Sequence, residues 1–277
     1  EPGGEPPANL YPRDPADGDA GAPGRSKVAV LASSALQVGL PALVVIVPWL
    51  LWKLDFYGSL VPNTFYAKVT GERAARFMQG VQFLSAFVSS YFLWPSVLLV
   101  VRSLPAIARS AAGPLLGALL FAYVYILSVG GDFMEFRFLV PTLPLAFVCG
   151  GWVLWNRVEQ SWLRAAVIAS VVVGSVHHEL TFRGEGGIES IPALSAHLDD
   201  PKQNWIGIGK KLRADLPEGS DVKIATTAAG AIPFFSRLVS IDMLGLTDPW
   251  IARHGVPSAL QIGHAKVAPL SHLRERG

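Results

Sequence analysis

The chain has 277 residues, of which 51% are hydrophobic and only 16% are charged. Soluble domains carry about 25% charged residues, so the chain is either embedded in a membrane or has its charge concentrated in a few places. The net charge of +2 does not indicate a partner, and no basic run suggests nucleic acid. The single cysteine, Cys149, excludes an intramolecular disulfide.

Residues 1–27 are rich in proline, glycine, alanine and aspartate, and contain too few apolar side chains to fold alone. They lack the apolar core and the cleavage site of a signal peptide. We therefore predict a loop or linker here. Because the chain opens on Glu1 rather than on methionine, we expect it to be the C-terminal part of a longer protein.

Five apolar stretches follow this linker, and a helix needs about 20 apolar residues to cross a bilayer. The predicted spans cover residues 28–52, 77–101, 112–130, 138–155 and 163–176. Pro41, Pro48 and Pro95 are expected to kink these helices rather than end them. We predict an α-helical multi-spanning membrane domain over residues 28–177, and the alternative is a large buried helical core in a soluble protein.

The connections between the predicted spans differ in charge. Arg25 and Lys27 directly precede the first span, and Arg102 and Arg109, with no acid between them, join the second to the third. Arg157 and Arg164, against Glu159, join the fourth to the fifth. Five spans place these regions on one side of the membrane, and the positive-inside rule makes that side cytoplasmic. The connection at residues 130–137 and everything after residue 177 are then predicted to lie outside.

Residues 53–77 break this charge pattern, because they lie outside in this topology yet carry more bases than acids. The bases are Lys53, Lys68, Arg73 and Arg76, and the acids are Asp55 and Glu72. Basic side chains can snorkel to lipid headgroups, or they can bind an anionic ligand at the membrane surface, such as a lipid phosphate. Both interpretations remain open.

Residues 178–277 have the composition of a small extracytoplasmic α/β domain. A helix is predicted from a cap at Asp199 or Asp200 to about Leu216. The runs "DVKIATT" and "RLVSIDML" are typical of strands, and the short crossover between them predicts a small parallel sheet. The "GIG" at residues 207–209 lies within the helical pattern, so it is not a dinucleotide fingerprint.

The segment "GLTDPWIARHG" predicts a second helix, in which Thr247 or Asp248 is the cap and Pro249 occupies the first turn. The sequence shows no cluster of metal ligands, and the adjacent His177 and His178 fit the end of a span better than a metal site.

Three segments resemble a known family when they are taken together: "YGSLVPNTFYAK" (57–68), "GGDFMEFRFLVPTLP" (130–144), and "SIDMLGLTDPWIARHG" (240–255) with the later "GHAK" (263–266). They resemble a bacterial family of GT-C-type membrane glycosyltransferases, which includes the mycobacterial terminal β-(1→2) arabinofuranosyltransferase and related flagellar motor control proteins. The resemblance covers most of residues 50–270.

This resemblance implies a GT-C-like enzyme of the bacterial cytoplasmic (inner) membrane that uses a polyprenyl-phosphate-linked sugar. Such enzymes pass the sugar from the outer leaflet to a glycan acceptor outside the cytoplasm. They place a catalytic acid in an early outward loop that this chain lacks, so the catalytic base is unassigned, although Asp132 is a candidate. No cofactor is required by the resemblance, and a divalent cation remains possible.

Sugar transfer from a phosphate needs a stabilised leaving group, and Lys68 and Arg137 are the candidate cations for it. Asp132 would hold a sugar hydroxyl, orient Arg137 or coordinate a divalent ion, and the alternative is a solvated turn with a local ion pair. Gly130 and Gly131 would let the backbone approach a ligand closely, or would simply end a helix.

Side chains that would supply hydrogen bonds and ring faces to a sugar are Tyr57, Asn63 and Tyr66. The tyrosines would otherwise be interface anchors, and Asn63 would be part of a turn after Pro62. Further candidates in the C-terminal region are Asp242, Asp248 and His264, for which capping or structural hydrogen bonds are the alternative. The rival function is a non-catalytic membrane protein, either a transporter or a flagellar-motor assembly factor.

Overall fold

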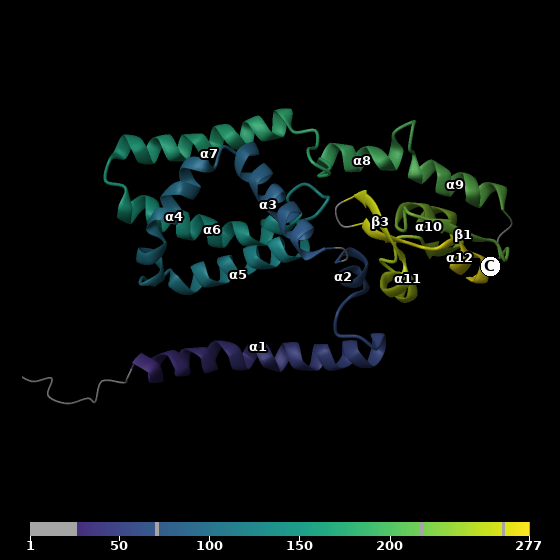
Figure 1. Cartoon of the computed structure of the whole chain (residues 1–277), viewed down its shortest axis with the longest axis horizontal. Coiled ribbons are helices and arrows are strands. Elements are labelled where there is room, and N and C mark those ends of the chain that lie inside the picture. The colour runs from purple at the N-terminus through teal and green to yellow at the C-terminus, as the bar shows by residue number, and fades with distance from the viewer. Residues whose placement is uncertain (1–26, 70–71, 217–218, 262–263, 277) are drawn as a thin grey trace, which may run out of the picture. The chain divides into compact units, whose positions relative to one another are not determined.

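The computed structural model describes residues 27–69, 72–216, 219–261 and 264–276, so most of the predicted linker, with Arg25, lies outside the described residues, as does Gly263. Two compact units are found, residues 1–60 and 61–277. The fold is mostly helical, with small sheets near the C-terminus (Figure 1).

The helices are α1 (Lys27–Tyr57), α2 (Asn63–Lys68), α3 (Arg73–Ser90), α4 (Trp94–Ala108), α5 (Gly113–Val129), the 3₁₀ helix η1 (Arg137–Thr142), α6 (Leu143–Arg157), α7 (Ser161–Thr181), α8 (Ile191–Asp199), α9 (Trp205–Asp215), α10 (Ala231–Ser236), α11 (Pro249–His254) and α12 (Leu270–Arg276). The strands are β1 (Lys223–Thr226), β2 (Val239–Asp242), β3 (Val256–Gln261) and β4 (His264–Val267).

Helix α1 is the described part of the first unit, and it contains the first predicted span. It runs for 31 residues through Pro41 and Pro48, so these prolines do not end it, as predicted. Its segment Gly39–Tyr57 is long and apolar enough to cross a membrane.

In the described residues, three helical segments meet the length and composition of a membrane span: Gly39–Tyr57, Arg137–Arg157 and Ser161–Thr181. A fourth is reached when the bent pair α3 and α4 is counted as one span, and α5 is apolar but shorter. Five spans were predicted. The difference arises because α5 has only 17 residues and because the second predicted span is interrupted.

The second predicted span, residues 77–101, is not one helix. Its two parts, α3 and α4, are bent by 117°, and Phe92 between them has a left-handed backbone with φ of 52°. Pro95 lacks an N–H group and clashes with the carbonyl four residues earlier, so it begins α4 and does not continue α3. The prediction that Pro95 would only kink this helix was wrong.

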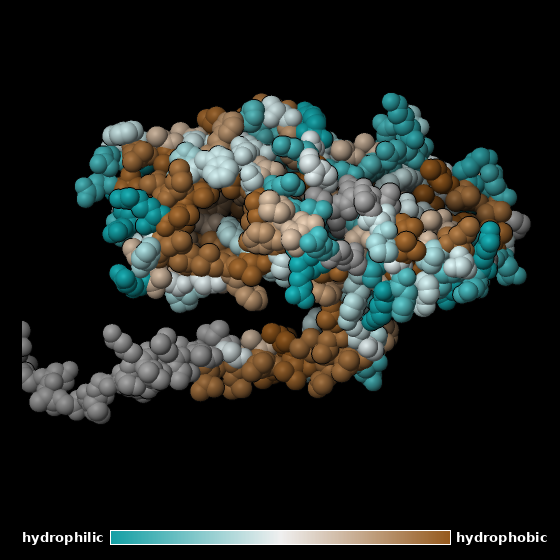
Figure 2. Space-filling model, in the orientation of Figure 1, coloured by the Kyte–Doolittle hydropathy of each residue, from teal (hydrophilic) through white to brown (hydrophobic). Residues whose placement is uncertain are grey.

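In the second unit, α3 packs on α5 and α7, while α4 packs on α5 and α6. Buried apolar residues such as Phe83, Ile126 and Leu139 form one core between these helices. Many large apolar side chains on the outside are exposed, and Figure 2 shows hydrophobic residues over the surface of the helices. In Figure 1 the α4–α5 and α6–α7 connections lie at one end of these helices, and the α5–η1 connection lies at the other.

The C-terminal region contains the predicted small parallel sheet. Strands β1 and β2 pair in parallel, and α10 forms the crossover between them. The core here includes Ile241, Ile251 and Ala268. Asp248 caps α11 through its side chain and Pro249 is in the first turn, which confirms that prediction.

Other features of this region differ from the prediction. Helix α9 begins at Trp205 with Asn204 as its cap, not at Asp199 or Asp200, because α8 occupies the preceding residues and ends at Asp199. The antiparallel pair β3 and β4 was not predicted. Helix α7 also continues to Thr181, so its last turn passes the predicted boundary at residue 177.

Candidate functional site

The α5–η1 loop, residues 130–137, carries the central side chains of the site. Gly130 ends α5 in the left-handed conformation, with φ of 87°, as a helix C-terminus often requires. Gly131 has φ of 81°, and a methyl group there would lie 2.7 Å from the Cβ and Cγ atoms of Phe83. The two glycines therefore end a helix and let the loop pack on α3, which is the second of the predicted alternatives.

Asp132 is fully buried, with an exposed fraction of 0%, and it pairs with two bases. Its Oδ1 lies 3.3 Å from Nζ of Lys68, at the end of α2. Its Oδ2 forms an ion pair with the guanidinium of Arg137, the first residue of η1. The turn is not solvated, because the carboxylate is removed from water. Its pair with Arg137 is local, as that alternative predicted, whereas its pair with Lys68 joins it to a separate segment.

The two bases are more exposed than the acid that joins them. The side chain of Lys68 is 20% exposed and that of Arg137 is 48% exposed. A lysine has three donor hydrogens and an arginine has five, and the carboxylate does not use them all. Asp132, Lys68 and Arg137, the Asp132 group, thus carry one positive charge in excess, and the bases have donor hydrogens that the carboxylate does not engage, which suits the group to bind an anion.

His264 on β4 lies beside this group. The ring of Phe133 lies 5.4 Å from Nζ of Lys68, and its centroid lies 4.6 Å from the centroid of the His264 ring. Burial, followed by the charge of Lys68, lowers the pKa of His264 below its ordinary value, while Asp132, Glu189 and Asp242 oppose this shift. A neutral imidazole at this position can donate or accept a hydrogen bond.

Glu135 anchors the same loop; it is one of the charged residues of this connection, but no site role was predicted for it from the sequence. Its Oε1 lies 2.8 Å from Nε2 of His178, and its Oε2 accepts a hydrogen bond of 2.7 Å from the backbone N–H of Ile191. His178 is 3% exposed and stacks against the rings of Tyr91 and Phe182. An acid in a span connection together with a histidine at the end of another span was the available signal.

A pocket of about 380 Å³ adjoins His178, between the ends of α3 and α7. Its lining is mainly polar: Ser89, Ser90, His177, His178, Thr181, Phe182, Arg183, Gly184 and Glu185. The two histidines therefore line a pocket of mainly polar residues at the end of α7, and His178 also forms a hydrogen bond with Glu135.

The remaining candidates of the first motif are placed differently. Tyr66 on α2 lies under the guanidinium of Arg253, whose Cζ is 4.6 Å from the ring centroid. Asn63 is the first residue of α2. Tyr57 belongs to the other unit, where its ring contacts Trp52 and Phe56.

Asp242 and Asp248 have structural partners. Both oxygens of Asp242 accept backbone N–H bonds, from Leu244 at 2.9 Å and Thr247 at 2.7 Å. Oδ1 of Asp248 accepts the N–H groups of the first turn of α11, and Oδ2 lies 3.2 Å from the guanidinium of Arg276. These contacts match the alternative of capping and structural hydrogen bonds, whereas His264 lies beside the α5–η1 loop, against the ring of Phe133.

Within the described ranges, no group of three or more histidine, cysteine, aspartate or glutamate side chains is placed to hold a metal ion. The candidate site consists of two bases, the buried acid that joins them and the neighbouring imidazole.

A family model described as a domain of unknown function (DUF8728) matches residues 196–275. The matched segment runs from the end of α8 into α12 and includes Asp242, Asp248 and His264, but not the α2 and α5–η1 segments. Comparison with curated proteins and with solved structures gave no significant match.

Proposed function

We propose that the chain is part of a membrane glycosyltransferase that moves a sugar from a polyprenyl-phosphate donor to a glycan acceptor outside the cytoplasm. The observation that carries the proposal is the convergence of Lys68 and Arg137 on the buried Asp132. The sequence resemblance supplies the reaction type, and the site supplies a place for the donor phosphate.

The membrane part of this proposal rests on the helices. Three segments have the length and composition of spans, and apolar side chains such as Phe121, Phe147 and Val172 are exposed, which costs free energy in water. The basic α4–α5 and α6–α7 connections lie at the end of the helices opposite to the α5–η1 loop (Figure 1). The positive-inside rule then assigns the Asp132 group to the outer face of the cytoplasmic membrane.

The reaction assigns a task to each charged group. The acceptor hydroxyl attacks the anomeric carbon and gives its proton to the catalytic base, for which no residue is assigned. The bond from that carbon to the phosphate oxygen breaks, and negative charge accumulates on the departing phosphate. Lys68 and Arg137 stabilise this charge because they are held in place before the reaction. Asp132 positions both bases from the buried side, and it is not placed to contact the acceptor.

The first test is transfer of a radiolabelled sugar from a polyprenyl-phosphate donor by membranes that contain the full-length protein. Asp132→Asn and Lys68→Ala should each abolish transfer and leave membrane insertion intact. A charge-assisted hydrogen bond contributes about 1.5–3 kcal/mol, so loss of Lys68 should also weaken binding of undecaprenyl phosphate by about tenfold or more.

Arg73→Ala is the matched control, because Arg73 is an exposed base at the start of α3 in the same predicted outer segment. It should leave transfer unchanged. If Arg73→Ala reduced transfer as much as Lys68→Ala, general attraction of bases to lipid headgroups would explain the result. Unchanged transfer in both Asp132→Asn and Lys68→Ala would refute the proposed site and favour a non-catalytic membrane protein.

A further inference from the structure

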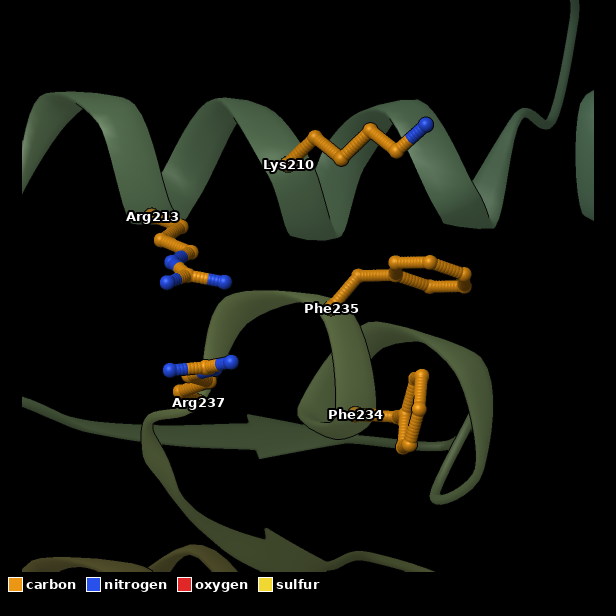
Figure 3. Close-up of a pocket in the computed structure, with 5 residues that line it drawn as sticks. All are labelled: Lys210, Arg213, Phe234, Phe235 and Arg237. Atoms are coloured by element: carbon orange, nitrogen blue, oxygen red, sulfur yellow. The ribbon is translucent and has the colours of Figure 1, made fainter.

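A second basic cluster lies in the C-terminal region, in a pocket of about 350 Å³ between α9 and α10. Its lining consists of three bases and two aromatic residues: Lys210, Arg213, Phe234, Phe235 and Arg237. Figure 3 shows Arg213 on α9 and Arg237 after α10 pointing toward one another, with both phenylalanine rings on the other side of the pocket. The pocket shares no residue with the Asp132 group.

The walls of this pocket are brought together by a glycine. A methyl group at Gly209 would lie 2.7 Å from Cβ of Phe235 and 2.9 Å from the carbonyl oxygen of Ile232. Helix α10 can therefore approach α9 closely only because residue 209 has no side chain. The "GIG" sequence thus has a packing role that places Arg213 opposite Arg237.

The three bases of the pocket have no acidic partner among the described residues. In the part of the chain that the structure describes, Lys210, Arg213 and Arg237 form no ion pair, whereas the neighbouring Lys211 pairs with Asp215 at 2.8 Å. Three like charges around one pocket repel each other. An anion would remove this repulsion, and two facing guanidinium groups can grip a phosphate or carboxylate through parallel hydrogen bonds.

The aromatic side of the pocket adds a second requirement on the ligand. Phe234 is 77% exposed, and its ring meets that of Phe235 edge-on, at 88° and with centroids 5.1 Å apart. Nζ of Lys210 lies 5.6 Å from the centroid of Phe235. An exposed ring face attracts the weakly positive C–H groups of a saturated ring, and two perpendicular rings do not form parallel walls for a flat base.

We propose that this pocket binds an anionic saccharide, a sugar ring that carries a phosphate or carboxylate group. The anion lies between Arg213 and Arg237, and the sugar ring lies against Phe234. This site is independent of the transfer reaction and of the Asp132 group, and it gives the DUF8728-matched segment a binding role of its own.

The test is ligand-observed NMR titration of the detergent-solubilised full-length protein with glucose 6-phosphate. Arg213→Ala and Arg237→Asn should each weaken binding by about tenfold or more, since each removes charge-assisted hydrogen bonds. Asparagine is chosen because residue 237 has φ of 58°, which asparagine tolerates better than alanine. Lys211→Ala, on the same helix but outside the pocket, is the matched control and should bind as the unaltered protein does.

Other probes separate the parts of the proposal. Glycerol 3-phosphate carries the phosphate without a ring and should bind more weakly, and Phe234→Ala should reduce the affinity for glucose 6-phosphate alone. Equal affinity for both phosphates would identify a site for phosphate headgroups, and tighter binding of AMP would identify a nucleotide site; either result would overturn the saccharide proposal. Binding that survives both arginine substitutions would overturn it as well.

Failure of sugar phosphate binding in the α9–α10 pocket can be distinguished from failure of the proposed sugar transfer at the Asp132 group. Lys68→Ala removes a base of the Asp132 group and should leave binding of glucose 6-phosphate in the α9–α10 pocket unchanged. If Lys68→Ala abolished this binding while Arg213→Ala did not, the sugar phosphate would occupy the Asp132 group, and the α9–α10 pocket would have no role in it.

Discussion

Substitution of Gly131 by alanine tests whether the packing of the α5–η1 loop on α3 positions Asp132. Residue 131 has φ of 81°, and a left-handed conformation costs about 1–2 kcal/mol for a residue with a Cβ atom. The new methyl group would lie 2.7 Å from Cβ and Cγ of Phe83, about 1 Å closer than the best carbon–carbon separation. Overpacking of this kind costs about 1–3 kcal/mol more, so Gly131→Ala should lower the free energy of unfolding by about 2–5 kcal/mol in total.

Gly186→Ala is a control that isolates the backbone contribution. Gly186 also has a positive φ, 58°, but nothing lies within 4 Å of an added methyl group. Gly186→Ala should therefore lower the free energy of unfolding by only about 1–2 kcal/mol. Thermal unfolding of both variants in detergent measures the difference, and the Gly131 variant should also lose affinity for undecaprenyl phosphate because Asp132 is displaced.

A third variant identifies the clashing partner. Phe83→Ala removes Cγ and Cδ2, two of the three Phe83 atoms nearest to a methyl group at residue 131, so the double variant Gly131→Ala with Phe83→Ala should lose less stability than the sum of the two single variants. If Gly131→Ala cost no more than Gly186→Ala, or if the two losses simply added, contact with Phe83 would not be what fixes the position of the loop.

Two further predictions concern the C-terminal region. Burial and the charge of Lys68 lower the pKa of His264 in the folded state, so its contribution to stability is present above the unfolded pKa of about 6.5 and is lost as pH falls below that value. When the pH is lowered from about 7.5 to about 5.5, the Tm of His264→Gln should therefore fall less than that of the unaltered protein. An equal fall in Tm would exclude His264 as the cause. Asp248→Ala removes the cap of α11 and the contact with Arg276, which should cost about 1–2 kcal/mol in thermal unfolding, whereas Asp215→Ala, which breaks an exposed pair, should cost about 0.5 kcal/mol or less.

The parts of the fold that the sequence predicts are those with a local physical cause. The strand, crossover, strand arrangement of β1, α10 and β2 follows from short β-rich runs between turn residues. The cap at Asp248 follows from an acid before Pro249. The apolar lengths of α1, α6 and α7 follow from composition.

The break between α3 and α4 depends on a contact that the local sequence does not contain. A proline inside an apolar helix is often tolerated, and α1 continues through Pro41 and Pro48. At Pro95 the chain turns instead, and the turn packs on α7, where a methyl group at Gly174 would overlap the carbonyl of Tyr91. Such a contact links residues about 80 positions apart and needs the tertiary structure.

In the site, too, some features follow from the local sequence and others depend on contacts between distant residues. The motifs single out Lys68, Asp132 and Arg137 as charged residues in otherwise apolar surroundings, but the pairing of Lys68 with Asp132 joins residues 64 positions apart. Glu135 was missed because its partner His178 lies 43 positions away. Residue type and position along the chain therefore predict which side chains are unusual, and the fold decides which of them meet.

Both acids of the α5–η1 loop are bound to distant segments, Asp132 to α2 and Glu135 to α7 and α8, so the loop is a structural junction as well as a site. The direction in which Asp132→Asn changes sugar transfer therefore distinguishes a role in positioning from a role of net charge. The substitution raises the positive charge of the group, so attraction of a phosphate by net charge alone would become stronger. If Asp132 instead holds Lys68 and Arg137 in the geometry that the leaving phosphate needs, transfer falls although the charge has become more favourable. Transfer that rises in Asp132→Asn would mean that charge, and not position, is what this group contributes.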